Sequence, residues 1–381
     1  MTKQYQIAGL CVVSESPLAL SSFASFLAET TSKADVHLHF CNITSTVPRQ
    51  LVCRQSTAVF YRTAHGWLYE SLNASPSIQL TSNREYTELT VCLPATQLSF
   101  APQQEQALLH LLRTALECRM ALNNALSLHS ACVALEGRAV AFTAPSGTGK
   151  STRAAAWVES LDAQWVSGDR PALCVTAHGI TAHGVPWDGK EQIFSSLAIP
   201  LLAICEVRRV DSGFVRLRRL NPAQARRLLM QQCFVPMWDT EATAAVFATI
   251  RKLATGTFVP VCRVFCGQDV AAARAVQDLL YHHPEQIMEA LPDMKIKDGF
   301  TLRDVAGEYM VMPTGDQIES FGGTLVLNET GAFFWDKLQA PAAREDVLDA
   351  LLAEYEVAPA AAEKDLNEFL EQLRSYGVLE E

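Results

Sequence analysis

The sequence predicts a mixed α/β fold of two or three domains, and three observations support this prediction. The chain has 381 residues, whereas a single domain usually has about 100–200 residues. Short β-branched or aromatic runs alternate with helical patterns along the first three quarters of the chain. Residues 301–381 hold 5 basic and 17 acidic side chains, a net charge of −12, although the whole chain carries −10. We therefore expect the acidic C-terminal part to be a separate domain.

The composition excludes several classes of protein. Hydrophobic residues make up 49% of the chain and charged residues 19%, which excludes a mainly disordered protein. None of the 11 cysteines forms a C-x-x-C pair, so we expect buried free thiols in a reducing compartment. Residues 1–6 have no signal-peptide character, and no apolar run approaches 18 residues. The sequence thus predicts a soluble, cytoplasmic protein that does not bind a membrane. Nucleic-acid binding is also not expected, since the C-terminal part lacks the basic surface that a phosphate backbone requires.

Residues 1–107 are expected to form a strand-rich segment that packs on the rest of the chain. Strands are predicted at four β-branched or aromatic runs: Ile7–Ser14, Val36–Phe40, Ala58–Arg62 and Tyr86–Leu93. A helix is predicted at Pro102–Leu122, because leucines recur there at helical spacing. No residue of this segment suggests a chemical role.

Residues 108–283 are expected to form a catalytic α/β domain. Its predicted strands are Ser130–Leu135, Arg138–Thr143, Gln164–Ser167, Ala172–Thr176, Leu201–Val210 and Val259–Cys266. Besides the helix already named, helices are predicted at Asn221–Cys233, Thr240–Leu253 and Val270–Tyr281, and a glycine-rich loop followed by a helix at Ala144–Leu161. Residues 284–297 contain two prolines and little periodicity, so they are the expected linker.

Residues 298–381 are expected to form a small winged-helix-like domain. Its predicted strands are Phe300–Asp304, Tyr309–Met312 and Thr324–Leu327. Its predicted helices are Glu329–Leu338, Arg344–Glu354 and Ala361–Ser375, and Gly377 ends the last of them.

The strongest motif follows the strand predicted at Arg138–Thr143. Residues 144–151 read Ala-Pro-Ser-Gly-Thr-Gly-Lys-Ser, a Walker A loop with Ala as its first residue, between a predicted strand and a predicted helix. Its glycines let backbone N–H groups turn towards a phosphate, and the helix N-terminus adds partial positive charge. We expect Lys150 to reach the β- and γ-phosphates of ATP and the Ser151 hydroxyl to bind Mg²⁺. The residues expected to bind the nucleotide are Pro145, Ser146, Gly147, Thr148, Gly149, Lys150, Ser151 and Thr152.

Two further residues are candidates for the chemistry of phosphoryl transfer. Asp169 follows the strand predicted at Gln164–Ser167, and it is a candidate base for an acceptor hydroxyl or a ligand of Mg²⁺. Because Gly-Asp is also common in turns, its position alone does not decide its role. His129 begins the strand before the Walker A strand and is a candidate neighbour of the phosphates, although a single histidine is more often structural.

Two other segments suggest contacts with a substrate. Trp187 and Lys190 lie in the turn-rich segment 184–190 and are candidates to face the acceptor; a surface turn anchored by Trp187 is the alternative. Residues 208–227 hold seven arginines, among which Arg218 is a candidate for binding the substrate, while a solvated face with salt bridges is the alternative for most of them. The seven are Arg208, Arg209, Arg216, Arg218, Arg219, Arg226 and Arg227.

The order of these residues resembles the catalytic domain of HPr kinase/phosphorylase and of related kinases encoded with peptide natural-product pathways. The resemblance covers about residues 108–281, with His129 before two strands, the Walker A loop after them, and Asp169 after the next strand. It implies a fold similar to phosphoenolpyruvate carboxykinase, with ATP and Mg²⁺ held by Lys150 and Ser151. It also implies that Asp169 removes the proton of the acceptor and that His129 lies beside the phosphates.

Residues 300–381 resemble PqqD. The segment Leu327–Trp335 matches the middle of that family, and the C-terminal Leu373-x-x-x-Gly377 matches its last helix end. Relatives recognise the leaders of ribosomally synthesised and post-translationally modified peptides (RiPPs), so the resemblance implies that a leader pairs with an exposed strand edge and lies against the last helix. We expect the edge at Tyr309–Met312 or the wing after it, and the acidic charge predicts a basic leader. The residues expected to contact the leader are Tyr309, Val311, Leu366, Phe369 and Leu373.

The sequence therefore favours an ATP-dependent kinase that phosphorylates a Ser or Thr hydroxyl of a RiPP precursor peptide. A peptide-binding adaptor that holds nucleotide without catalysis is an alternative, supported by Gly168 where HPr kinases often have an aspartate. A kinase for a small metabolite is a third possibility. The acceptor residue, the fate of the phosphate, the choice of phosphate donor and the oligomeric state, including a homo-oligomer, stay open.

Overall fold

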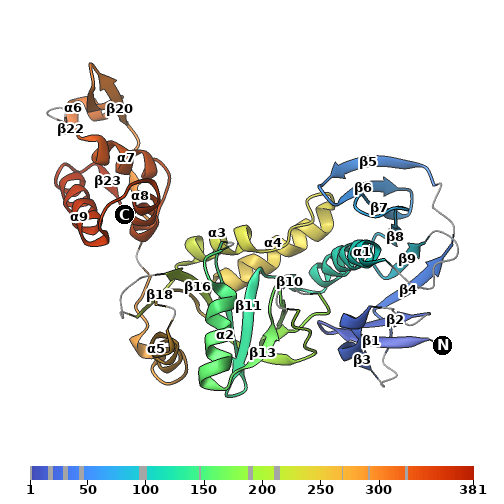
Figure 1. The fold of residues 1–381 in the computed structure, drawn as a ribbon. Helices are drawn as coiled ribbons and strands as arrows, with labels where there is room; N and C mark the ends of the chain where they lie inside the picture. The colour runs from blue at the N-terminus through green and yellow to red at the C-terminus, as the bar shows by residue number, and fades with distance from the viewer. Residues whose placement is uncertain are drawn as a thin grey trace. The chain divides into compact units, whose positions relative to one another are not determined.

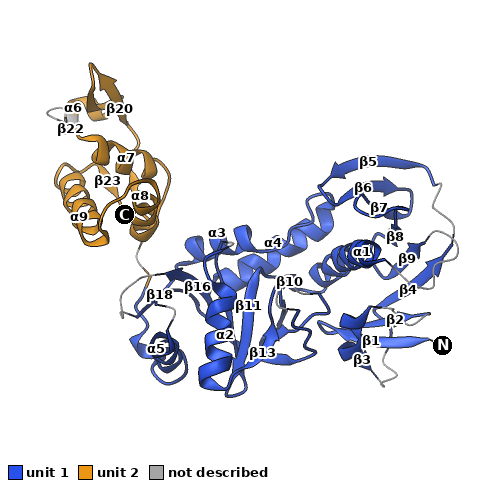
Figure 2. Ribbon diagram, in the orientation of Figure 1, with its two compact units in different colours: residues 1–289 blue, residues 290–381 orange. Residues whose placement is uncertain are grey.

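The computed structural model of the chain describes residues 2–15, 20–28, 33–42, 47–93, 101–145, 147–187, 192–209, 215–267, 269–290, 292–321 and 325–381. The backbone divides into two compact units, residues 1–289 and 290–381 (Figures 1 and 2). The boundary expected at residues 107/108 falls inside helix α1 (Pro102–Leu122), which packs on the N-terminal sheet, so this part of the chain is continuous with the next.

The N-terminal sheet lies within residues 3–92 and is followed by helix α1. Its strands are β1 (Lys3–Ile7), β2 (Leu10–Ser14), β3 (Leu27–Ala28), β4 (Val36–Cys41), β5 (Arg49–Arg54), β6 (Ala58–Thr63), β7 (Gly66–Ser71), β8 (Gln79–Asn83) and β9 (Glu88–Cys92), with a 3₁₀ turn at Ser21–Phe26. Their order in the described sheet is β3-β1-β2-β4-β9-β8-β7-β6-β5. The single strand predicted at Ile7–Ser14 is instead a hairpin, because Ala8 and Gly9 adopt φ angles of 52° and 79° and reverse the chain.

A buried polar chain ties this sheet to helix α4 (Thr240–Ala254). The Tyr69 hydroxyl donates to the Tyr86 hydroxyl at 3.1 Å, and Tyr86 donates to Asp239 Oδ2 at 2.7 Å. The other Asp239 oxygen caps α4 by accepting from the backbone N–H groups of Glu241 and Ala242. Burial raises the pKa of both tyrosines, so they stay neutral donors.

The second sheet contains the predicted Walker A strand. Its strands are β10 (Ala125–Ser127), β11 (Ser130–Leu135), β12 (Arg138–Thr143), β13 (Gln164–Ser167), β14 (Ala172–Thr176), β15 (Gly179–His183), β16 (Ala198–Arg209), β17 (Arg216–Arg219) and β18 (Val261–Cys266). The order is β10-β14-β15-β16-β12-β11-β13, and β18 pairs with both β16 and β17. Strands β12, β16 and β18 are parallel. Almost all of the residues in the middle of each of these strands are buried, as expected for strands covered on both faces of the sheet.

Helices cover both faces of this sheet (Figure 1). Helices α2 (Lys150–Leu161) and α5 (Val270–Tyr281) share one hydrophobic cluster with the sheet, and α3 (Pro222–Gln232) and α4 share another. Trp157 of α2 is fully buried and packs edge-on against Phe142 of β12, with ring centroids 5.3 Å apart. Truncating a buried aromatic side chain to alanine typically costs about 3–5 kcal/mol, so this contact holds α2 firmly on the Walker A strand.

The C-terminal unit has its own core. A short turn at Pro284–Gln286 precedes it, and its strands are β19 (Lys295–Ile296), β20 (Phe300–Val305), β21 (Glu308–Pro313), β22 (Leu325–Leu327) and β23 (Leu379–Glu380). Its helices are α6 (Gln317–Ser320), α7 (Glu329–Lys337), α8 (Arg344–Glu354) and α9 (Pro359–Ser375). Its core cluster contains residues between Met294 and Leu379. The mixed α/β class is thus confirmed, and the strands and helices predicted in this unit correspond to β20–β22 and α7–α9, to which the structure adds β19, β23 and α6.

Candidate functional site

The topology of the second sheet brings three separate segments to one edge. Strand β11 runs antiparallel to both β12 and β13, so the start of β11 lies at the same edge as the ends of β12 and β13. The loop 144–149 follows β12, His129 precedes β11, and Asp169 follows β13. The backbone N–H of Arg170 donates to the Ser130 carbonyl at 3.2 Å, which holds the Asp169 turn against the start of β11.

The described residues of the loop after β12 include two glycines in a conformation that suits an anion-binding loop. Gly147 and Gly149 have φ angles of 83° and 94°, in the left-handed region that favours glycine. Gly149 is the N-cap residue of α2, so the positive end of the helix dipole points at the loop. The Thr148 hydroxyl donates to the Pro145 carbonyl at 2.8 Å and closes the turn. Ser146 lies outside the described residues.

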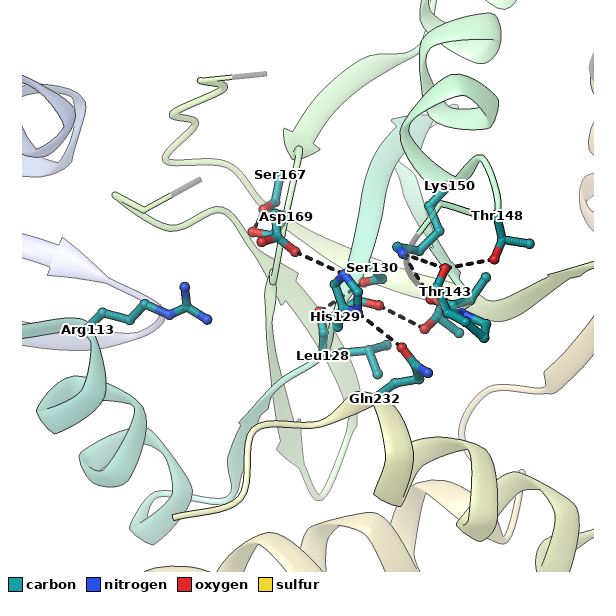
Figure 3. Close-up of polar contacts among 12 residues, drawn as sticks. Arg113, Leu128, His129, Ser130, Thr143, Thr148, Lys150, Ser167, Asp169 and Gln232 are labelled. Carbon is teal, nitrogen blue, oxygen red and sulfur yellow. Dashed lines mark hydrogen bonds and ion pairs between the residues drawn. The ribbon is translucent and has the colours of Figure 1, made fainter. Parts of the chain in front are cut away.

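Lys150 places its ammonium group inside the curve of this loop (Figure 3). Its Nζ donates to the Ala144 carbonyl at 2.9 Å and to the Pro145 carbonyl at 3.3 Å. Burial lowers the pKa of Lys150, while the negative charge of Asp169 opposes this shift. Ser151 is half-buried and Thr152 is exposed on the first turn of α2.

His129 links the end of α3 to the Asp169 turn (Figure 3). Its Nδ1 lies 3.2 Å from Gln232 Oε1, and its Nε2 lies 3.9 Å from Asp169 Oδ1. Burial lowers the pKa of His129, and the positive charge of Lys150 lowers it further, while Asp169 raises it. The imidazole is therefore neutral at neutral pH. The side chains of His129 and Asp169 are 28% and 27% exposed, so an acceptor group can reach both.

Gln232 is a residue of this site that the sequence did not reveal. It ends α3, is 8% exposed, and its backbone carbonyl accepts from the His129 N–H at 2.8 Å. The helical pattern of 221–233 placed it on a helix, but only the antiparallel bridge between Leu128 and Cys233, the neighbours of His129 and Gln232, brings it to His129.

Two of the predicted substrate contacts in this unit are buried. Trp187 is 2% exposed and belongs to the core cluster beneath α1, so it anchors its turn rather than facing an acceptor. Arg218 of β17 is 7% exposed. Lys190 lies outside the described residues.

The C-terminal unit contains a groove between β22 and α9 with a volume of about 520 Å³. Phe334 and Phe369 form an apolar part of its lining, while Asp365 and Glu368 supply carboxylates from α9. Strand β22 is the outer strand of the described sheet order β20-β21-β22, and its Val326 is 51% exposed. The groove is lined by Val326, Leu327, Asn328, Thr330, Gly331, Phe334, Asp365, Glu368, Phe369 and Gln372.

The strand edge that is free to pair with a peptide differs from the predicted one. Strand β21 pairs with β20 on one side and β22 on the other, so Tyr309 and Val311 do not lie on a free edge, contrary to the prediction. Leu366 and Leu373 are 0% exposed, because they face the core of the unit rather than the groove. Phe369 is the one predicted contact in α9 that lines the groove.

Comparisons with known proteins give one match to a family model and several to solved structures. Residues 308–379 match the family model of coenzyme PQQ synthesis protein D (PqqD). Among solved structures, the chain is similar to TbiB1 in complex with the TbiA(beta) leader peptide, with 28% identity, coverage of 23% of this chain and 94% of that chain, and a TM-score of 0.20. It is also similar to lasso peptide synthetase B1 complexed with the leader peptide, with 21% identity, 23% and 99% coverage, and a TM-score of 0.21.

A third solved structure is also similar to this chain. The Hpr(Ser) kinase/phosphatase from Coxiella burnetii is similar with 10% identity, coverage of 42% of this chain and 90% of that chain, and a TM-score of 0.25. No curated protein sequence matches this chain. Within the described residues, no helix is both long and apolar enough to span a membrane.

Proposed function

We propose that this chain is an ATP-dependent kinase that phosphorylates a Ser or Thr hydroxyl of a RiPP precursor peptide. The observation that carries the proposal is the meeting of the 144–149 loop, His129 and Asp169 at one sheet edge. The same chain carries a domain that matches PqqD and contains a groove beside an outer strand. The first unit supplies the chemistry, and the second captures the substrate.

The residues of the loop fit a nucleoside triphosphate with Mg²⁺. Left-handed Gly147 and Gly149, the N-terminus of α2 and the Lys150 ammonium all favour an anion in this place. The described residues contain no group of three or more His, Cys, Asp or Glu side chains arranged for a metal. Mg²⁺ needs only one or two protein ligands beside phosphates and water, and Ser151 and Asp169 are the residues that would hold it. Bound there, it would neutralise phosphate charge.

His129 and Asp169 together can take the proton of the acceptor. If Nδ1–H donates to Gln232 Oε1, the lone pair of Nε2 points towards Asp169 across 3.9 Å. Asp169 accepts the hydroxyl proton as the oxygen attacks the γ-phosphorus, and the Nε2 lone pair of the neutral imidazole can accept a hydrogen bond from the protonated carboxyl once the two groups move closer than 3.9 Å. Its lowered pKa keeps His129 ready for this role at neutral pH.

The groove of the C-terminal unit suits an extended leader segment. The outer strand β22 can add a peptide strand through main-chain hydrogen bonds, and the groove then supplies side-chain pockets. Phe334 and Phe369 favour an apolar leader residue, while Asp365 and Glu368 favour a Lys or Arg. Because the leader is tethered to the core peptide, binding here raises the local concentration of the acceptor hydroxyl at the catalytic unit.

The dependence of phosphorylation on the leader tests whether the C-terminal unit captures the substrate for the first unit. We expect chain 1–289, which retains three of the four core clusters, to phosphorylate a full-length precursor with an apparent KM at least about 100-fold higher than that of the full chain, as lost tethering predicts. The two forms should phosphorylate a leaderless peptide equally. An unchanged KM would show that the C-terminal unit does not capture substrate, and faster reaction with leaderless small hydroxy compounds would favour a metabolite kinase.

A further inference from the structure

Strand β16 carries an arginine past the end of the Walker A strand. The two strands are parallel, with Thr143 of β12 opposite Glu206 of β16. Strand β12 ends at Thr143, whereas β16 continues to Arg209. At about 3.3 Å per residue, the Cα of Arg208 lies roughly 7 Å beyond the level of Thr143. Arg208 therefore flanks the start of the loop, where Lys150 binds the Ala144 and Pro145 carbonyls.

The alternation of β16 fixes which face Arg208 occupies. Ile204 belongs to the cluster with α3 and α4, and Cys205 to the cluster with α2 and α5. Since successive side chains alternate, Glu206 and Arg208 lie on the α3 and α4 face, and Arg209 lies on the opposite face. The α3 and α4 face is also the one that receives His129 through Gln232.

A buried carboxylate holds Arg208 in place. Glu206 is 4% exposed, and its Oε2 accepts from Arg263 Nε at 2.8 Å. Its Oε1 lies 2.9 Å from Arg208 Nη2. The Arg208 side chain is 27% exposed, whereas that of Glu206 is 5% exposed, so a partly accessible guanidinium is held by a buried carboxylate. A guanidinium fixed in this way loses little conformational entropy when it binds a phosphate.

We propose that Arg208 binds the γ-phosphate of the nucleotide and neutralises the charge that develops during transfer. This inference rests on the proposed function. Strand β12 lies between β16, which carries Arg208, and β11, which follows His129, so the γ-phosphate would be contacted from both sides. In the step, the bond between the γ-phosphorus and the bridging oxygen breaks, the acceptor oxygen bonds to phosphorus, its proton goes to Asp169, and ADP leaves. Arg208 makes hydrogen bonds to the transferred oxygens and no covalent bond.

Calorimetric titration of the full chain with Mg²⁺ and either ADP or a non-hydrolysable ATP analogue tests this assignment. We expect Arg208→Ala to weaken binding of the ATP analogue by about 10-fold or more, the range for losing a charge-assisted hydrogen bond, and to leave ADP binding within about 2-fold. Arg208→Lys should lie between Arg208→Ala and wild type. Arg209→Ala, which removes the same charge from the other face of the same strand, should leave both affinities unchanged.

Each result has a distinct meaning. Equal weakening of both nucleotides by Arg208→Ala, or the same result for Arg208→Ala and Arg209→Ala, would overturn the γ-phosphate assignment while the proposed nucleotide site survived. A wild-type chain that binds neither nucleotide would overturn the proposed function and this inference together. A thermal melt of each variant would identify one that fails to fold, and Arg208→Lys then decides the question through its ratio of ATP-analogue to ADP affinity.

Discussion

At the scale of single residues, the proposed phosphoryl transfer depends on Asp169. The Ser167 hydroxyl donates to the Asp169 carbonyl at 2.8 Å, and Arg170 adopts a φ of 56°, so the local turn aims the carboxylate at His129. In the sequence this residue resembled an ordinary turn aspartate. What distinguishes it is a strand pairing, β11 with β13, that no local pattern encodes.

Replacing Asp169 by Asn tests its role as the base. We expect Asp169→Asn to lower kcat for phosphoryl transfer by about 10²–10⁴, the usual range for losing a general base, with ATP affinity retained. Asp162→Asn is a matched control, because Asp162 ends α2 in a left-handed conformation that Asn also adopts. Initial rates at saturating ATP would measure kcat. Wild-type turnover in Asp169→Asn would remove this residue from the mechanism.

At the scale of elements, β22 and α9 form the surface that should choose the leader. The sequence predicted three strands of this unit but left the free edge open between Tyr309–Met312 and the wing after it, because local periodicity does not determine the order of strands in a sheet. It also assigned Leu366 and Leu373 to the peptide, since a helical stripe shows which residues share a face but not which neighbour covers that face.

Charge reversal on α9 tests the preference for a basic leader. We expect Glu368→Lys to weaken binding of a labelled basic leader by about 3- to 10-fold in fluorescence anisotropy, as expected for a close, partly screened charge pair. The loss should shrink as salt rises. Glu371→Lys makes the same charge change on an exposed position of α9 outside the groove lining and should have a smaller effect. Equal effects of the two variants would mean that only net charge matters.

Other elements show which parts of the fold a local sequence pattern can predict. The strand, loop and helix of the Walker A region were predictable, because a motif of fixed spacing lay between two clear periodic patterns. Strand β5 was missed, since most of its residues are exposed and its apolar positions do not alternate. Trp187 was ambiguous for a different reason: an aromatic residue in a turn can pack inward or face a ligand, and only the core beneath α1 settles which.

At the scale of the whole molecule, acid should destabilise the fold before its carboxylates titrate. Burial lowers the pKa values of His110, His129 and His183 below the ordinary 6.5, so below neutral pH the unfolded chain binds more protons than the folded chain. The stability from these residues is present above pH 6.5 and is lost as pH falls through their folded pKa values. We expect urea unfolding to give a lower free energy at pH 5.5 than at pH 7.5.

One histidine acts in the opposite direction and serves as the control. His39 lies 2.7 Å from Glu15 and 3.0 Å from Glu88, and although burial opposes it, these carboxylates raise the pKa of His39. Its contribution is present at low pH and is lost as pH rises, so His39→Gln should steepen the loss of stability on acidification. Greater stability of the wild-type chain at pH 5.5 than at pH 7.5 would contradict this account of the buried histidines.

The central claim is that one chain captures a precursor peptide and phosphorylates it. Intact-mass spectrometry of a candidate precursor peptide, incubated with the full chain, ATP and Mg²⁺, tests this most directly. We predict a gain of about 80 Da, one phosphate on a hydroxyl, that disappears with Lys150→Ala although that variant still binds the leader. A peptide whose leader binds tightly but whose mass does not change would contradict the kinase and favour a nucleotide-binding adaptor.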